Sequence, residues 1–142
     1  MKVKDCMTKN VICVGAEEAV SVAARLMARY NVGTLPVRGA DGRIRGMLTD
    51  RDVAVRCVAA EKAAGSARVA DIMSNRVVAI SPEADVLHAA EIMANEQIRR
   101  LPVLEDGRIA GMLTVGDLSR REQFSDSAAE CLGSICSGIH RT

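Results

Sequence analysis

Apolar positions along the chain follow two periods, and together they predict a mixture of strands and helices. Two short β-branched stretches, residues 11–14 and 77–80, predict strands. Each is followed by apolar residues at helical spacing, which predicts helices over residues 16–30 and 82–96. In the second helix, Ser81-Pro82 has the chemistry of an N-cap followed by the first helical residue.

A predicted hairpin follows each of these helices. The turns are marked by Asp41-Gly42 and Asp106-Gly107, because glycine adopts positive φ without steric cost. A further helix is predicted to begin at Thr49, ending near Gly65, and another to begin at Thr114. The strands of the two hairpins would span residues 32–38, 43–48, 98–104 and 108–113.

The chain is an internal duplication, since the second set of elements repeats the first about 66 positions later. Leu35-Pro36-Val37 recurs as Leu101-Pro102-Val103, and Gly46-Met47-Leu48-Thr49 recurs as Gly111-Met112-Leu113-Thr114. Each copy is therefore β-α-β-β-α, which predicts an α+β fold of two repeats packed about a pseudo-two-fold axis. The predicted boundaries are residues 5–64 for repeat 1, 65–70 for a linker, 71–120 for repeat 2 and 121–142 for a C-terminal tail.

Composition narrows the functional classes. The 142 residues are 49% hydrophobic and 26% charged, with a formal net charge of +1, so nothing favours binding to nucleic acid or to an anionic membrane. The N-terminus resembles no signal peptide, and no apolar run approaches membrane-spanning length. Five cysteines, an odd number without regular spacing, do not resemble a disulfide framework. We therefore expect a cytoplasmic protein.

The candidate chemistry lies in the two copies of one motif, Gly46–Asp52 and Gly111–Asp117. In each copy a strand ends, a threonine hydroxyl follows, and a carboxylate comes three residues later at the start of a helix. Such a helix start attracts phosphate, the carboxylate can accept ribose hydroxyls, and the glycine would admit a ligand close to the backbone. The same spacing also describes a capping box, which needs no ligand. Both interpretations stay open at this point.

The duplication, the Leu-Pro-Val strands and the doubled Gly-x-x-Thr-x-x-Asp motif resemble a tandem pair of CBS domains, a Bateman module. The motif at residues 46–52 and the Ile135-Cys136-Ser137 ending are similar to the stand-alone hypoxic-response CBS proteins of actinobacteria. The resemblance implies a non-enzymatic sensor that binds AMP, ADP, ATP, NAD(H) or S-adenosylmethionine between its repeats. It also implies a homodimer that signals to an unidentified protein partner.

By the same resemblance, Asp52 and Asp117 would accept ribose hydroxyls, while Thr49 and Thr114 would face the ribose-phosphate. The implied adenine-facing walls are Met7, Ile12, Val32 and Gly33 for the Asp117 site, and Met73, Val78, Ile98 and Arg99 for the Asp52 site.

The two copies are unequal beside the motif. Arg99-Arg100, where the family places basic residues that contact phosphate, corresponds to Gly33-Thr34 in the first copy. Asp50 adds a negative charge to the first motif, whereas Val115 in the second is neutral. We therefore expect the Asp117 site to be the occupied one.

Other polar residues give weaker signals. Cys131, Cys136 and His140 do not have zinc-ligand spacing, so no metal site is expected. Cys13 is expected in the core, and His88 on a helix surface. No nucleophile and base are suitably spaced, so catalysis is not expected. Two alternatives remain. One is a ligand-free structural or interaction module, which the resemblance associates with stress or hypoxia, and the other is a thiol redox sensor that uses Cys131 and Cys136.

Overall fold

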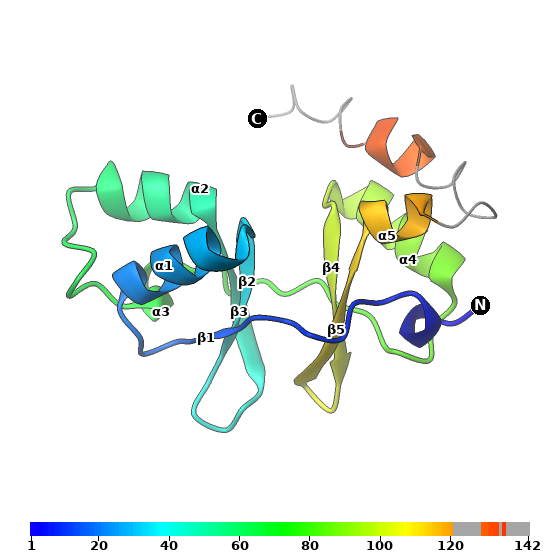
Figure 1. The fold of residues 1–142 in the computed structure, drawn as a ribbon, viewed down its shortest axis with the longest axis horizontal. Coiled ribbons are helices and arrows are strands. Elements are labelled where there is room, and N and C mark those ends of the chain that lie inside the picture. Colours follow the sequence, from blue (N-terminus) through cyan, green and yellow to red (C-terminus); the bar gives the residue numbers. More distant parts are fainter. Residues whose placement is uncertain (121–128, 134, 136–142) are drawn as a thin grey trace. The chain divides into compact units, whose positions relative to one another are not determined.

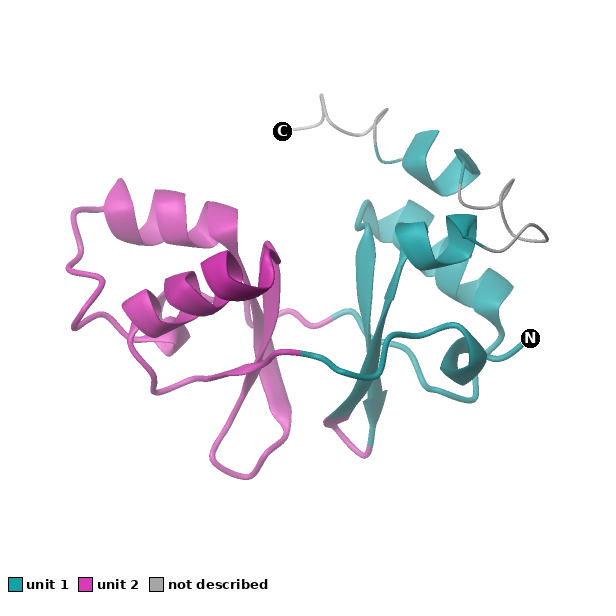
Figure 2. Cartoon of the chain, in the orientation of Figure 1, with its two compact units in different colours: residues 1–11, 78–105, 109–142 teal, residues 12–77, 106–108 magenta. Residues whose placement is uncertain are grey.

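The computed structural model describes residues 1–120, 129–133 and 135 of the chain, and the chain divides into two compact units (Figure 2). Unit 2 contains residues 12–77 and 106–108, and unit 1 contains the remaining residues. These units do not follow the repeat boundaries, since residues 1–11, at the start of the first copy, belong with the second copy. Each unit has its own hydrophobic core.

Unit 2 is built on a three-stranded sheet of order β1-β2-β3 (Figure 1). β1 pairs parallel to β2, which pairs antiparallel to β3. Gly42, with φ of 83°, lies in the turn between β2 and β3, as predicted. The bounds are β1 Val14–Gly15, α1 Val20–Tyr30, β2 Thr34–Arg38, β3 Ile44–Thr49, α2 Asp50–Asp52, η2 Val53–Val58 and α3 Val69–Ile72.

Unit 1 repeats this plan with a two-stranded sheet of β4 and β5. The predicted strand at residues 77–80 is reduced to one parallel bridge between Ile80 and Val103, in the register that Val14 and Val37 have in unit 2. The turn between β4 and β5 uses positive φ at Asp106 and Gly107. The bounds are η1 Val3–Asp5, α4 Val86–Glu96, β4 Arg100–Glu105, β5 Arg108–Thr114 and α5 Val115–Ser119.

The first helix of each copy begins four residues later than the sequence predicts. α4 begins at Val86, and its N-cap is Asp85, whose side chain accepts from the Leu87 N–H at 2.8 Å. Ser81-Pro82 is therefore not the cap. Residues 82–84 instead form a turn that pairs with the N-terminal segment: Val3 N–H donates to Ala84 O at 2.9 Å. These non-local backbone bonds override the local proline signal.

The helix that follows Thr49 is also shorter than predicted. α2 continues directly into η2, a π-helix that ends at Val58 rather than near Gly65. Glu61 has a φ of 59°, and this left-handed conformation is incompatible with a continuing helix. No described helix is long and apolar enough to cross a membrane.

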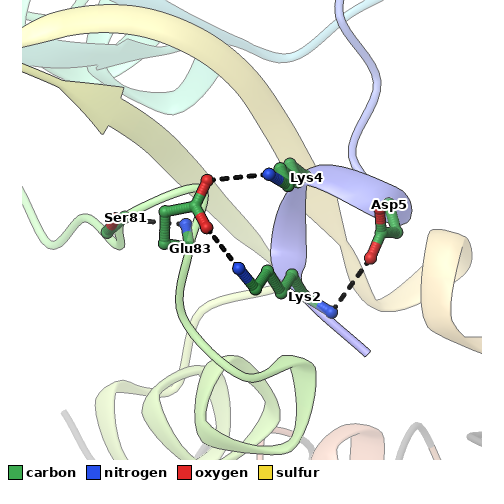
Figure 3. Close-up of polar contacts among 5 residues, drawn as sticks. All are labelled: Lys2, Lys4, Asp5, Ser81 and Glu83. Atoms are coloured by element: carbon green, nitrogen blue, oxygen red, sulfur yellow. Dashed lines mark hydrogen bonds and ion pairs between the residues drawn. The ribbon is translucent and has the colours of Figure 1, made fainter.

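The N-terminal segment is attached to unit 1 by backbone hydrogen bonds and by the ion pairs that Figure 3 shows. The Lys2 and Lys4 ammonium groups lie 2.6 Å and 2.9 Å from the two carboxylate oxygens of Glu83. These lysines lower the pKa of Glu83 to about 2, chiefly through hydrogen bonds to its carboxylate. Val3 lies between them in the sequence and is fully buried in the unit 1 core. The segment is therefore an integral part of this unit.

Candidate functional site

Both copies of the motif form the same capping box. The Thr49 hydroxyl accepts from the Asp52 N–H at 3.0 Å, and Asp52 Oδ2 accepts from the Thr49 N–H at 2.9 Å. Thr114 and Asp117 make the equivalent pair of bonds at the same two distances. Capping is thus real in both copies, and it occupies only one carboxylate oxygen of each aspartate.

The backbone N–H groups at these helix starts are largely occupied, which corrects the expectation that they would attract phosphate. Val115 N–H donates to Arg99 O at 3.0 Å, and Asp50 N–H donates to Gly33 O at 2.9 Å. α5 is also only five residues long. Any ligand recognition by the second motif must therefore come mainly from side chains.

The second carboxylate oxygen of each aspartate faces an arginine. Asp52 Oδ1 lies 3.7 Å from Arg56 Nε, whereas Asp117 Oδ1 accepts a hydrogen bond from Arg120 Nη2. Asp117 is 5% exposed and is the one buried charged residue of the described chain. A buried carboxylate needs partners, and here the backbone and one guanidinium group supply them.

The motif glycines have a different role from the one predicted. A Cβ on Gly46 would lie 2.5 Å from the carbonyl oxygen of Ser74, and a Cβ on Gly111 would lie 2.5 Å from Met7 Sδ. Each glycine is therefore approached closely by the protein's own chain, at the bridges Met47–Ser74 and Thr8–Met112, rather than leaving space for a ligand.

A cavity of about 540 Å³ lies beside the second motif, entirely within unit 1. Its volume is in the range of small-molecule sites. Its polar lining includes Thr8, Arg99, Arg100, Thr114, Asp117 and Arg120. Val115, Gly116, Ser119 and Leu132 complete it.

Four of the predicted site residues thus come together: Thr114, Asp117, Arg99 and Arg100. Arg99 lines the cavity of Asp117, although the resemblance assigns it to the Asp52 site. Of the remaining predicted residues, Met7, Val78 and Ile98 belong to unit 1, and Ile12, Val32, Gly33, Thr49, Asp52 and Met73 belong to unit 2. The apolar ones among them, Met7, Ile12, Val32, Met73, Val78 and Ile98, are members of the hydrophobic cores or pack against them.

Sequence reasoning missed Arg120 and Thr8. Arg120 has a local signal, because it follows Asp117 by three residues and one helical turn brings such pairs together. Thr8 has no local signal, since it reaches the cavity through its bridge to Met112, 104 positions later.

The thiols and His88 give little support for a redox or metal site. Burial raises the pKa of the Cys131 thiol, which is 1% exposed, and a raised pKa disfavours the reactive thiolate. Cys13 is half-buried rather than in the core, and desolvation raises its pKa also. His88 is exposed, as predicted. No group of three metal-ligating side chains occurs among the described residues; Cys136 and His140 lie outside them.

Two copies of a strand-helix unit that share a Thr-x-x-Asp capping box define a duplicated α+β module. The CBS domain family model matches this chain twice, at residues 3–58 and 69–123. The chain belongs to the CBS domain family, as a tandem pair.

The chain is similar to stand-alone CBS proteins. It is 32% identical over 117 residues to hypoxic response protein 1 of Mycobacterium tuberculosis, covering 82% of each chain. A crystal structure of hypoxic response protein I with two coordinated zinc ions matches with a TM-score of 0.78 and 31% identity, covering 85% of this chain and 98% of that one. The CBS pair of protein MJ0100, in complex with 5′-methylthioadenosine and S-adenosyl-L-methionine, matches with a TM-score of 0.74 and 28% identity, covering 84% and 94%.

Proposed function

We propose that this chain is a regulatory protein that binds an adenosine-containing ligand in the Asp117 cavity. The cavity itself is the observation that carries the proposal, because it gathers the hydroxyl and carboxylate of the second motif with three arginines. The ligand classes are AMP, ADP, ATP, NAD(H) and S-adenosylmethionine. The adenosyl ligands of the MJ0100 pair support this choice.

The proposed contacts follow from the hydrogen-bonding capacity of the motif. Asp117 Oδ2 accepts from a backbone N–H, and both oxygens keep lone pairs that the two hydroxyls of a ribose can use. The Thr114 hydroxyl accepts from the Asp117 N–H and still has its own proton to donate. Arg99 and Arg100 supply donors for phosphate.

We propose that the output passes through another molecule, because residues 3–58 and 69–123 are CBS domains, which this proposal gives a binding role. We propose a cytoplasmic homodimer that contacts a protein partner and carries out no catalysis itself. Val55 and Val58, which are 48% and 66% exposed on η2, support an apolar contact surface. Sedimentation velocity of the purified protein tests the dimer, and a purely monomeric boundary at micromolar concentration would contradict it.

Calorimetric titration with each of the five ligand classes tests the binding. We expect Asp117→Asn, which keeps a side-chain oxygen for the cap, to weaken binding at least tenfold, about 1.4 kcal/mol. Asp52→Asn is the matched substitution in the other motif, and a greater loss there would move the site to unit 2. No heat with any ligand, from protein whose circular dichroism is native, would refute the proposal.

A second function is favoured by one specific observation: both capping boxes are complete without a ligand. If the motifs are only caps, the chain is a structural or interaction module. Asp52→Asn and Asp117→Asn would then lower stability by similar amounts, about 1 kcal/mol or less, and would change no ligand response.

A further inference from the structure

Arg120 lines the cavity and is hydrogen-bonded there to the buried carboxylate of Asp117. Its Nη2 donates to Asp117 Oδ1, and the carboxylate is 5% exposed while the arginine side chain is 71% exposed. The buried carboxylate therefore holds an exposed guanidinium group, which has five donors and uses few of them in this contact.

The charged lining of the cavity is strongly cationic. Among the described residues, the charged side chains that line it are Arg99, Arg100, Arg120 and Asp117. The Asp117 carboxylate balances one guanidinium group, so two positive charges remain uncompensated by the lining. The hydroxyl groups of Thr8 and Thr114 can also donate hydrogen bonds to an anion. A ligand with a multiply negative tail would complement this lining.

The corresponding position in the first copy has the opposite character. Asp50 N–H donates to Gly33 O just as Val115 N–H donates to Arg99 O. A Cβ on Gly33 would lie 2.9 Å from Asp50 Oδ2, so a carboxylate occupies the space into which a side chain at this position would extend. Gly33 in place of Arg99 removes a positive charge at this position, and Asp50 in place of Val115 adds a negative one. Of the two copies, the second is therefore better suited to an anionic tail.

We propose that the Asp117 cavity selects nucleoside polyphosphates, and that Arg120 is the residue that determines this specificity. The inference rests on the proposed function and narrows its ligand class. Asp117 holds the guanidinium group of Arg120 in the cavity that Arg99 and Arg100 also line, and in the proposed complex the three contact the phosphate chain. A neutral 5′-thioether or a cationic sulfonium group gains nothing from these arginines, in contrast to the ligands of the MJ0100 pair.

The experiment compares ligands that share adenosine and differ in charge. Titrations of the whole protein with adenosine, AMP, ADP, ATP and S-adenosylmethionine should show affinity rising with each phosphate, with ATP about a hundredfold tighter than adenosine. Arg120→Gln should weaken ATP about tenfold and change adenosine by less than about twofold. Arg120→Lys should restore part of the ATP affinity, because it retains the charge but not the planar guanidinium fork.

Two further measurements separate charge from folding. Raising NaCl from about 0.05 M to about 0.5 M should weaken ATP binding but not adenosine binding, with a smaller dependence in Arg120→Gln. Arg25→Gln is the control, since it removes the same charge from an exposed position on α1. It should leave the ATP affinity within about twofold of the wild type.

Three results would overturn the inference and leave the proposed function standing. These are equal affinities for adenosine and ATP, tighter binding of S-adenosylmethionine than of ATP, and an equal loss of adenosine and ATP affinity in Arg120→Gln. The last would mean that Arg120 acts only by positioning Asp117. If no adenosine compound binds at all, both the inference and the proposed function fail.

Discussion

The motif glycines provide a strict test of how the chain packs beside the capping boxes. In Gly46→Ala, the new Cβ would meet the Ser74 carbonyl oxygen at 2.5 Å and Met73 Sδ at 2.7 Å. That carbonyl is fixed, because Met47 N–H donates to it at 3.0 Å and the reciprocal bond measures 2.9 Å. The clash can be relieved only by a shift of the backbone. We therefore expect the free energy of unfolding to fall by about 2–3 kcal/mol, the upper part of the range for overpacking.

Gly111→Ala should cost less. There the Cβ would meet Met7 Sδ at 2.5 Å and Met7 Cγ at 2.9 Å, with Thr8 O also at 2.9 Å. Met7 is half-buried and flexible, so part of the clash is relieved by rotation of the side chain, and we expect a loss of about 1–2 kcal/mol. Gly65→Ala is the control, since nothing lies within 4 Å of its Cβ and its φ is not positive. It should be neutral, or stabilising by up to about 1 kcal/mol.

Urea unfolding followed by circular dichroism measures all three variants. Two double-mutant cycles then separate side-chain from backbone clashes: Gly111→Ala with Met7→Ala, and Gly46→Ala with Met73→Ala. We expect a favourable coupling of about 1 kcal/mol for the first pair and a much smaller one for the second, because removing Met73 leaves the Ser74 carbonyl in place. If Gly46→Ala were as harmless as Gly65→Ala, or if the couplings were reversed, the packing argument would be refuted.

Three further predictions concern the cap of α4, the N-terminal ion pairs and the thiols. Asp85→Ala should lower stability by about 1 kcal/mol and Ser81→Ala by less, measured by urea unfolding; equal losses would contradict the helix start. Because the folded-state pKa of Glu83 is lowered from 4.5 to about 2, its contribution to stability is present above pH 4.5 and is lost as pH falls toward 2. In thermal melts, the melting temperature of the wild type should therefore approach that of Glu83→Gln over this pH interval. High salt should bring the two melting temperatures together as well, since the ion pairs are exposed. Native alkylation followed by mass spectrometry should label Cys6 well before Cys131, which is 1% exposed, and equal rates would show that the Cys131 site opens readily.

Local signals predicted the hairpins, both capping boxes and the inequality of the two copies. An Asp-Gly turn and a Thr-x-x-Asp cap depend on residues within a few positions of one another, so a single stretch of sequence contains the whole interaction. For the same reason Arg120 was within reach of prediction. It follows Asp117 by one helical turn, and only its pairing with that carboxylate had to be considered.

Contacts between distant segments were the part that sequence could not predict. Pro82 is a good first helical residue in isolation, but the backbone of residues 82–84 instead accepts hydrogen bonds from residues 3 and 4. The role of Gly111 likewise depends on Met7 and Thr8, about a hundred positions away. Such pairings have no period and no fixed spacing, so they become visible only in the folded chain.

Residues 1–11 begin the first copy but belong to unit 1, and unit 2 extends to residue 77, past the start of the second copy. This division affects the order in which the protein folds during synthesis. Residues 12–77 contain nearly all of unit 2, so its core can close before the second half of the chain has been made. Val3 cannot pack into its core until later, because the other members of that core lie at Ile80 and beyond. The segment around Val3 is therefore made before residues 12–77 but packs into its core after them. Separating the halves near residue 65 would leave each without a segment that its core requires.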